Sequence, residues 1–160
     1  MTDFAIPAVD LEIDRDILVV DDEKAIRDMV AVFLRRLGFH VETAGDGAEA
    51  LEKLRAKKYF LVISDVGMPG ISGMDLLSAV KDLGPAEDPV PTDVIIVTGK
   101  SAESVAVDAL RRGAYDYFRK PFSFDAMTFT VRRLLERRRL NRQATTVYPH
   151  PRKTGIPGTE

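Results

Sequence analysis

The fold can be read from one stretch of the chain, ILVVDDEKAIRDMVAVFLRRLG, which spans residues 17–38. Its first four residues are apolar and mostly β-branched, as in a buried strand, and they end at the pair Asp21-Asp22. Apolar residues then recur at helical spacing as far as Leu37, and Gly38 stands where a helix C-cap glycine belongs. The stretch therefore predicts a buried strand that leads directly into an amphipathic helix.

The same strand and helix unit recurs four times in the rest of the chain. The remaining strands are predicted at 40–44, 59–64, 93–98 and 115–120, each followed by a helical pattern. Strands that alternate with helices are typical of a parallel sheet with helices on both faces, and two-sided burial explains strands that are apolar without alternation. We therefore expect an α/β, flavodoxin-like fold: a doubly wound five-stranded parallel sheet in the order 2-1-3-4-5, flanked by five helices.

The composition is that of an ordinary globular chain of 160 residues, with 45% apolar and 30% charged residues and a net charge of −2. The absence of cysteine excludes a disulfide framework, a zinc ribbon and a thiol nucleophile. The charge is not that of a protein that binds nucleic acid directly, and no apolar run approaches the roughly 20 residues of a membrane span. Since the start of the chain also lacks the pattern of a secretory signal, we expect a cytoplasmic protein with no membrane partner.

The chain is predicted to hold one domain between two extensions. Residues 1–16 are acidic and aperiodic and are predicted to form a flexible tail, residues 17–138 the domain, and residues 139–160 a basic helical extension with a flexible tail or linker. Six arginines stand against Glu136 between residues 132 and 142. They indicate either a solvated helix that leaves the domain or a contact for an acidic partner or nucleic acid.

Polar residues stand at the carboxyl ends of four predicted strands. Asp21 and Asp22 end the first strand, Asp65 the third, Thr98 the fourth and Lys120 the fifth. In the predicted order these ends meet at one edge of the sheet, around the switch point where ligands bind in such folds. Two carboxylates about 5 Å apart repel each other by roughly 3 kcal/mol at an effective dielectric constant near 20. The cluster therefore needs positive charge, which Lys120 supplies in part.

A hard divalent cation is expected to supply the rest of the positive charge. The cluster offers oxygen ligands without histidine or cysteine, which suits Mg²⁺. Taken singly, each residue has a simpler explanation, because an aspartate after a strand commonly caps a helix, a lysine is commonly solvated and a threonine is a common strand residue. The agreement of all five residues across four strands favours one shared site over these separate explanations.

Four motifs together resemble the receiver domain of two-component response regulators, the CheY-like family. They are VVDDE (19–23), SDVGMPG (64–70), VTG (97–99) and YDYFRKPF (115–122), which occur in the order and at spacings similar to those of that family over about residues 17–138. The resemblance implies that a histidine of a sensor kinase, or a phosphotransfer protein, donates a phosphoryl group to Asp65. It also implies that the protein is not an enzyme, apart from catalysing its own phosphorylation and dephosphorylation.

The resemblance implies a role for each matching residue. The implied Mg²⁺ ligands are Asp21, Asp22, Asp65 and the carbonyl of Gly67. Thr98 and Lys120 are the implied contacts of the phosphoryl oxygens, and Tyr117 is the implied aromatic switch residue. Pro121 matches the proline that often follows the lysine in a cis peptide bond. The chain departs from many relatives at Gly67, where they carry a side chain, and at Ser72, where they carry aspartate.

The sequence says less about the downstream output of the protein than about its proposed phosphorylation site. The resemblance implies a switch surface at residues 98–135 for partner binding or for a homodimer, read by a downstream effector or by the protein's own output domain. The chain is alternatively the receiver module of a larger regulator, such as a transcription factor, an ATPase-type activator or a hybrid kinase. A haloacid-dehalogenase-like phosphatase needs a second aspartate where this chain has Gly67, and a flavin or nucleotide binder needs a phosphate loop where DDEKAIR (21–27) is acidic.

Overall fold

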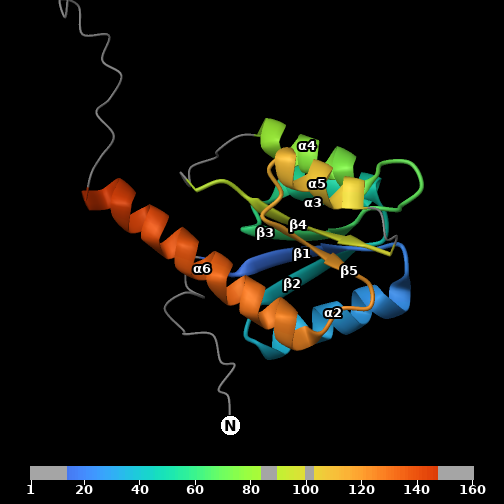
Figure 1. The fold of residues 1–160 in the computed structure, drawn as a ribbon, viewed down its shortest axis with the longest axis horizontal. Coiled ribbons are helices and arrows are strands. Elements are labelled where there is room, and N and C mark those ends of the chain that lie inside the picture. Colours follow the sequence, from blue (N-terminus) through green and yellow to red (C-terminus); the bar gives the residue numbers. More distant parts are fainter. Residues whose placement is uncertain (1–13, 84–89, 100–102, 148–160) are drawn as a thin grey trace, which may run out of the picture.

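Five strands form one parallel sheet (Figure 1). The computed structural model describes residues 14–83, 90–99 and 103–147. Along the chain the elements are β1 (Asp16–Val20), α2 (Lys24–Arg36), β2 (His40–Ala44), α3 (Gly47–Ala56), β3 (Leu61–Asp65), α4 (Gly73–Leu83), β4 (Asp93–Thr98), α5 (Glu103–Arg111), β5 (Asp116–Arg119) and α6 (Phe124–Val147). The strand order is β2-β1-β3-β4-β5, and every neighbouring pair is parallel. The predicted fold class and strand order are therefore confirmed.

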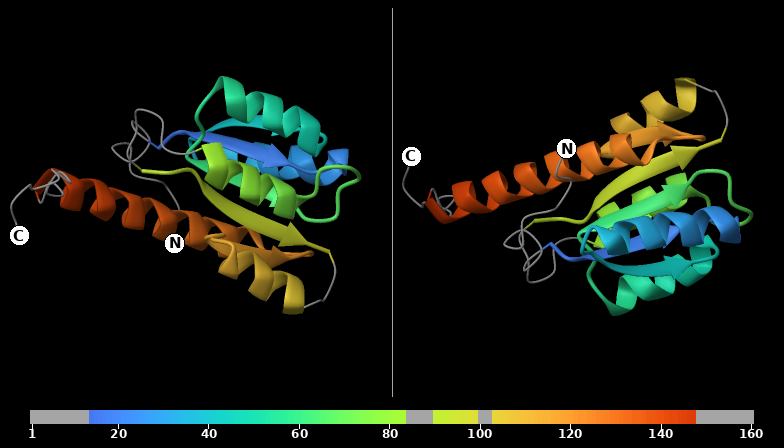
Figure 2. Two further views of the ribbon diagram at one scale, coloured as in Figure 1. Left: turned by 90° about the horizontal axis from the view of Figure 1, so that it is seen from above. Right: turned by 90° about the horizontal axis from the view of Figure 1, so that it is seen from below.

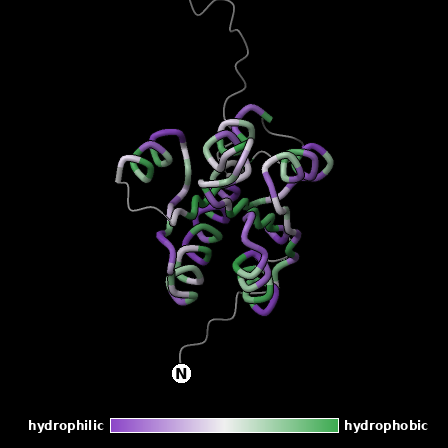
Figure 3. Tube along the Cα trace, turned by 90° about the vertical axis from the view of Figure 1, so that its right-hand side faces the viewer, coloured by the Kyte–Doolittle hydropathy of each residue, from purple (hydrophilic) through white to green (hydrophobic). Residues whose placement is uncertain are grey.

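Helices cover both faces of the sheet (Figures 1 and 2). One core lies under α2 and α6, and a second lies under α3, α4 and α5. Alternate strand residues enter the two cores, so that Ile17 and Val19 belong to the first, and Leu18 and Val20 to the second. In Figure 3 the hydrophobic strands lie in the middle of the molecule and hydrophilic segments gather on the outer turns of the helices. This two-sided burial is the reason why the strands are apolar without alternation.

The strand register sets the level at which the strands end. Val20 of β1 pairs with Ser64, so Asp21 follows at the level of Asp65 on the neighbouring strand. Asp65 in turn pairs with Val97, and Thr98 pairs with Arg119, the residue before Lys120. The polar residues that end or follow these strands therefore meet at one edge, which we call the carboxyl edge, as predicted. The opposite ends of the strands form the amino edge.

Local chemistry explains several helix ends. Gly38, after α2, has a φ of 107°, in the left-handed region that favours glycine. Asp46 caps α3 by accepting a 2.8 Å hydrogen bond from the backbone N–H of Glu49. At the start of α4, Ser72 and Asp75 exchange hydrogen bonds between side chain and backbone of 3.1 and 3.0 Å. The Ser72 hydroxyl thus caps the start of α4.

Regular structure extends beyond residues 17–138 at both ends. β1 begins at Asp16, and Asp14, which the sequence placed in the tail, is buried. α6 runs without a break from Phe124 to Val147. The rest of the predicted extensions, residues 1–13 and 148–160, lies outside the described residues. Among the described helices, none is both long and apolar enough to cross a membrane.

Candidate functional site

Three carboxylates meet at the carboxyl edge of the sheet. Asp21 and Asp22 follow β1, and Asp65 ends β3, the neighbouring strand. Oxygen atoms of the three side chains lie within 4.8 Å of one another. Asp21 and Asp65 are buried, whereas Asp22 is exposed. An all-oxygen donor set that opens to solvent on one side fits Mg²⁺, which binds through one or two carboxylates and keeps several waters.

Lys120 brings a positive charge into this cluster. Its ammonium donates a 2.9 Å hydrogen bond to Oδ2 of Asp21 and lies 3.6 Å from Oδ2 of Asp65. A third carboxylate, that of Glu23, lies 3.6 Å from the same nitrogen. The Lys120 side chain is 14% exposed and both Asp21 and Asp65 are buried, so water screens these two ion pairs only weakly. The peptide bond between Lys120 and Pro121 is cis.

The environment shifts the pKa values of Asp65 and Lys120, the two central groups of the site. Burial raises the pKa of the Asp65 carboxyl above its ordinary value of 3.8, and the negative charges of Asp21 and Asp22 raise it further. The charge of Lys120 and a hydrogen bond from the Gly67 backbone lower this pKa, but they do not cancel the rise. For Lys120, burial alone would lower the pKa, but the hydrogen bond to Asp21 and the neighbouring carboxylates raise it above 10.5 overall. The site therefore combines a carboxylate that is costly to ionise with an ammonium that stays charged.

Thr98 and Tyr117 lie on the two strands beyond β3. Thr98 is buried at the end of β4, and its carbonyl accepts a 2.8 Å hydrogen bond from the backbone N–H of Lys120. Tyr117 is half-buried on β5 and packs against the core under α3, α4 and α5. It pairs with Ile96, two residues before the end of β4. The structure thus places the three aspartates, Thr98 and Lys120 at one edge, with Tyr117 further back in the sheet.

Two residues that the sequence analysis did not single out also belong to this edge. Arg27 of α2 donates a 2.6 Å hydrogen bond to the backbone carbonyl of Asp21 and lines a narrow cavity with Asp21 and Asp65. The backbone N–H of Glu23 donates a 2.9 Å hydrogen bond to Oδ1 of Asp21. Both contacts restrain the loop that carries the acidic pair. The acidic run DDE (21–23) in the sequence indicated that Glu23 could belong to the site. The helical spacing around Arg27 gave no such indication.

The loop between β3 and α4 passes close to the backbone of Asp65. The N–H of Val66 donates a 2.9 Å hydrogen bond to the carbonyl of Val97, and the N–H of Gly73 donates one of 3.3 Å to the carbonyl of Val66. A Cβ atom at Gly73 would collide with the carbonyl of Asp65, whereas a Cβ atom at Gly67 would meet nothing within 4 Å. The absence of a side chain at Gly73 therefore allows α4 to begin directly against the end of β3.

We expect Gly73→Ala to lower the free energy of unfolding by about 1–3 kcal/mol, because the added methyl group is overpacked against rigid backbone. Gly67→Ala is the matched control: it adds the same group in the loop that precedes α4, where there is space, and should change stability by less than about 0.5 kcal/mol. Urea unfolding followed by circular dichroism measures both variants. Equal losses in the two would contradict the role given to the close approach at Gly73.

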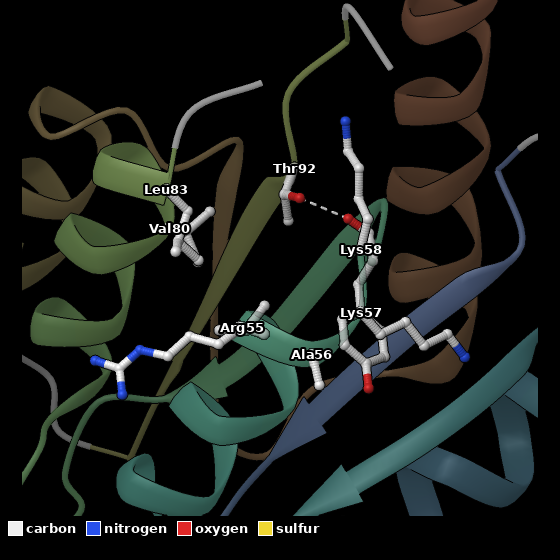
Figure 4. A pocket seen from close by; sticks show the side chains of 9 residues that line it. Arg55, Ala56, Lys57, Lys58, Val80, Leu83 and Thr92 are labelled. Carbon is white, nitrogen blue, oxygen red and sulfur yellow. Dashed lines mark hydrogen bonds between the residues drawn. The ribbon is translucent and has the colours of Figure 1, made fainter. Parts of the chain in front are cut away.

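A cavity of about 370 Å³ lies at the amino edge, between the ends of α3 and α4 (Figure 4). Its lining includes Lys57, Lys58 and Thr92, and no acidic side chain is among the described residues around it. Lys57 lies 3.0 Å from carboxylates of Asp16 and Glu42, and Lys58 donates a 2.8 Å hydrogen bond to a backbone carbonyl. No cluster of carboxylates like that of Asp21, Asp22 and Asp65 lines this cavity among the described residues, and the candidate site is therefore the carboxyl edge.

Comparison with known proteins relates the chain to receiver domains. The family model for the response regulator receiver domain matches residues 17–132. The transcriptional regulatory protein ZraR of Klebsiella oxytoca is 37% identical over 134 residues, which cover 84% of this chain and 29% of ZraR. The probable transcriptional regulatory protein TcrX of Mycobacterium tuberculosis is 36% identical over 121 residues, which cover 76% of this chain and 50% of TcrX. The chain thus spans half or less of the length of these two curated relatives.

Solved structures of isolated receiver domains are similar over nearly their whole length. The receiver domain of NtrX from Brucella abortus is 38% identical, with a TM-score of 0.68, and the match covers 76% of this chain and 98% of that one. A response regulator receiver domain protein from Clostridium thermocellum is 32% identical, with a TM-score of 0.70, and the match covers 79% of this chain and 98% of that one. All residues of the carboxyl-edge cluster lie within the matched family region.

Proposed function

Because the chain belongs to the response regulator receiver domain family, we propose that it is the phosphoryl acceptor of a two-component system, with Asp65 as the acceptor residue. The observation that supports this assignment is the surroundings of Asp65. Its carboxylate lies within 4.8 Å of those of Asp21 and Asp22 and 3.6 Å from the ammonium of Lys120. This geometry supports the proposal, because phosphoryl transfer to a carboxylate requires neighbouring groups that can hold a metal ion and a cation close to the nucleophile.

In the proposed reaction, a carboxylate oxygen of Asp65 attacks the phosphorus atom of a phosphohistidine. The phosphorus–nitrogen bond breaks, and its electron pair stays on the imidazole nitrogen, which takes up a proton. The donor is a sensor histidine kinase or a phosphotransfer protein. Lys120 and Thr98 offer an ammonium and a hydroxyl to the phosphoryl oxygens, and both side chains come from strand ends that already face the same edge. The protein has no separate substrate and catalyses only its own phosphorylation and dephosphorylation.

Asp21, Asp22 and Asp65, together with the carbonyl of Gly67, would hold Mg²⁺. The bound ion supplies charge neutralisation for the transferring phosphoryl group. Asp22 is exposed, which leaves the site accessible from solvent. Arg27, through its 2.6 Å hydrogen bond to the carbonyl of Asp21, keeps the acidic loop in place. This arginine would position the ligands, since it donates its hydrogen bond to the backbone of Asp21 and not to a carboxylate.

Phosphorylation is proposed to change the surface formed by residues 98–135, of which 100–102 lie outside the described residues. A phosphoryl group adds three acceptor oxygens, which would draw the Thr98 hydroxyl toward Asp65 and let Tyr117 turn inward. The surface carries exposed apolar side chains: Val107 and Leu110 on α5, and Phe129 on α6. A downstream effector, the protein's own output domain or a second copy of the chain would bind one of the two states more tightly.

The second candidate role is that of a receiver module within a larger regulator. The limited coverage of ZraR and TcrX favours it, as does NtrX of Brucella abortus, where a match with a TM-score of 0.74 covers 82% of this chain and 29% of that one. The haloacid-dehalogenase alternative is set aside, because the family found is a different one and Gly67 offers no carboxylate. A cytoplasmic location is part of the proposal.

Asp65→Asn is expected to abolish phosphoryl uptake from acetyl phosphate or phosphoramidate in the presence of Mg²⁺, because the amide is not a nucleophile for this transfer. Intact mass spectrometry should show the gain of one phosphoryl group in the parent and none in the variant. Asp75→Asn is the control, since Asp75 is an exposed aspartate that follows the same strand, and it should retain uptake. Equal uptake by the parent and by Asp65→Asn would overturn the assignment of the acceptor.

A further inference from the structure

Arg138 of α6 is completely buried and lies among charged groups. Its Nη1 donates hydrogen bonds of 2.7 Å to Oδ2 of Asp93 and 2.6 Å to the carbonyl of Pro91. Its Nε lies 3.1 Å from Oδ2 of Asp14, and its guanidinium carbon is 5.5 Å from the centre of the Phe60 ring. The sequence predicts that the arginines of this helix either are solvated or contact an external partner. Arg138 fits neither alternative, because 0% of its side chain is exposed.

Two further arginines extend this network along α6. Arg137 pairs with the other carboxylate oxygen of Asp93 at 2.7 Å and lies over the ring of Tyr115 at 4.5 Å. Arg142, one turn further on, lies 2.6 Å from Oδ2 of Asp14. Two buried carboxylates are thus shared by three arginines over the last part of the helix. We call these residues the α6 clamp: Asp14, Asp93, Arg137, Arg138 and Arg142.

The clamp lies where α6 leaves the body of the protein. Asp93 opens β4 and Asp14 precedes β1, so both carboxylates are at the amino edge, away from the Asp65 site. The apolar contacts of α6 with the sheet are made by residues before the clamp, the last of them Leu135. Figures 1 and 2 show the remaining turns of the helix extending beyond the sheet. Past Leu135, the arginines of the clamp contact Asp93 of β4 and Asp14, which precedes β1.

The physical chemistry of the clamp favours a role in orientation over a role in stability. Nε and Nη2 of Arg138 and Oδ1 of Asp14 have no hydrogen-bond partner among the described residues, so the 3.1 Å contact between Nε and Asp14 is an ion pair without a hydrogen bond. A buried ionic network that is incompletely satisfied is a weak source of stability, because the cost of removing its charges from water is not fully offset. A planar guanidinium shared between fixed carboxylates does, however, restrict geometry closely.

We infer that the α6 clamp fixes the direction in which the last turns of α6 leave the receiver domain. Residues 139–147 then move as one rigid body with β1 and β4, and a segment or partner held at the end of α6 takes its orientation from the sheet. The clamp acts through the fold and does not require phosphorylation of Asp65.

The chain contains no cysteine, so spin labels can be placed at Glu52→Cys on α3 and Gln143→Cys on α6, both exposed positions. Double electron–electron resonance then reports the distribution of distances between the body and the helix end. The clamped protein should give one narrow distribution. The distance distribution should widen by at least about twofold in the triple variant Asp14→Asn/Asp93→Asn/Arg138→Met. It should widen to a smaller extent in the single variant Asp14→Asn.

Arg139→Gln is the matched control, because it removes an arginine from the same helix that pairs at 2.7 Å with Glu136 on the surface. It should leave the width unchanged. The melting temperature is measured on the same samples, and the triple variant should widen the distribution while keeping a cooperative transition close to that of the parent. Should the triple variant not fold, Asp14→Asn alone decides. A distribution as narrow as that of the parent, equal widening by Arg139→Gln, or widening only in variants that melt much earlier would overturn the inference.

Discussion

Replacing Lys120 with methionine is expected to lower the free energy of unfolding by about 2–4 kcal/mol at pH 7 without divalent metal. Asp21 and Asp65 are both buried and would lose the ammonium that now lies 2.9 and 3.6 Å from them. Urea unfolding followed by circular dichroism measures the loss. Lys24→Met is the matched control, since Lys24 pairs with Asp28 on the surface with 80% of its side chain exposed, and its loss should stay within about 0.5 kcal/mol.

The pH dependence of this loss follows from the two shifted groups. The pKa of Lys120 lies above 10.5 in the folded protein, so its stabilising contribution is complete below that value and disappears as the pH rises past it. Burial raises the pKa of Asp65 above 3.8, so its ionisation costs stability as the pH rises above that value. Without Lys120 the cost of ionising Asp65 increases. The difference in the free energy of unfolding between Lys120→Met and the parent should therefore shrink as the pH falls from 7 toward 4. A difference that is constant over this range would show that packing, not charge, causes the loss.

The location of the site was predictable because buried parallel strands are short apolar runs that all end at the same edge. Asp65 and Thr98 are the last residues of their strands, and Asp21 and Lys120 directly follow theirs. Once alternating strands and helices indicate a doubly wound sheet, its strand order brings these ends together without knowledge of any contact. The acidic cluster and its lysine then follow from the residue types alone.

The contacts made by arginines were not predictable in the same way. Arg27 donates to a backbone carbonyl, and Arg138 is buried between carboxylates that belong to Asp14 and Asp93. Helical periodicity marks the apolar face of a helix and assigns its arginines to solvent, so it carries no information about such partners. Asp14 was placed in a loose tail for the same reason, because its partners lie near the other end of the chain.

Magnesium is expected to stabilise the protein by mass action at the three aspartates. A ligand that binds only the folded state adds RT ln(1 + [Mg²⁺]/Kd), which is about 1.4 kcal/mol at ten times Kd and about 2.7 kcal/mol at one hundred times Kd. The gain is expected here because a divalent cation relieves the repulsion among carboxylates whose oxygens lie within 4.8 Å. Thermal unfolding monitored by circular dichroism over a Mg²⁺ titration measures it directly.

Asp22→Ala separates metal binding from a general effect of salt, because it removes one ligand and one repelling charge together. The metal-free variant should therefore be at least as stable as the metal-free parent, while most of its gain from Mg²⁺ should be lost. Glu23→Ala is the matched control: Glu23 is the next acidic residue and lies 3.6 Å from Lys120, but it is outside the proposed ligand set and should leave the gain from Mg²⁺ intact. If Asp22→Ala kept the full gain, or if Glu23→Ala lost as much of it, the ion would have to be bound by other groups than those assigned here.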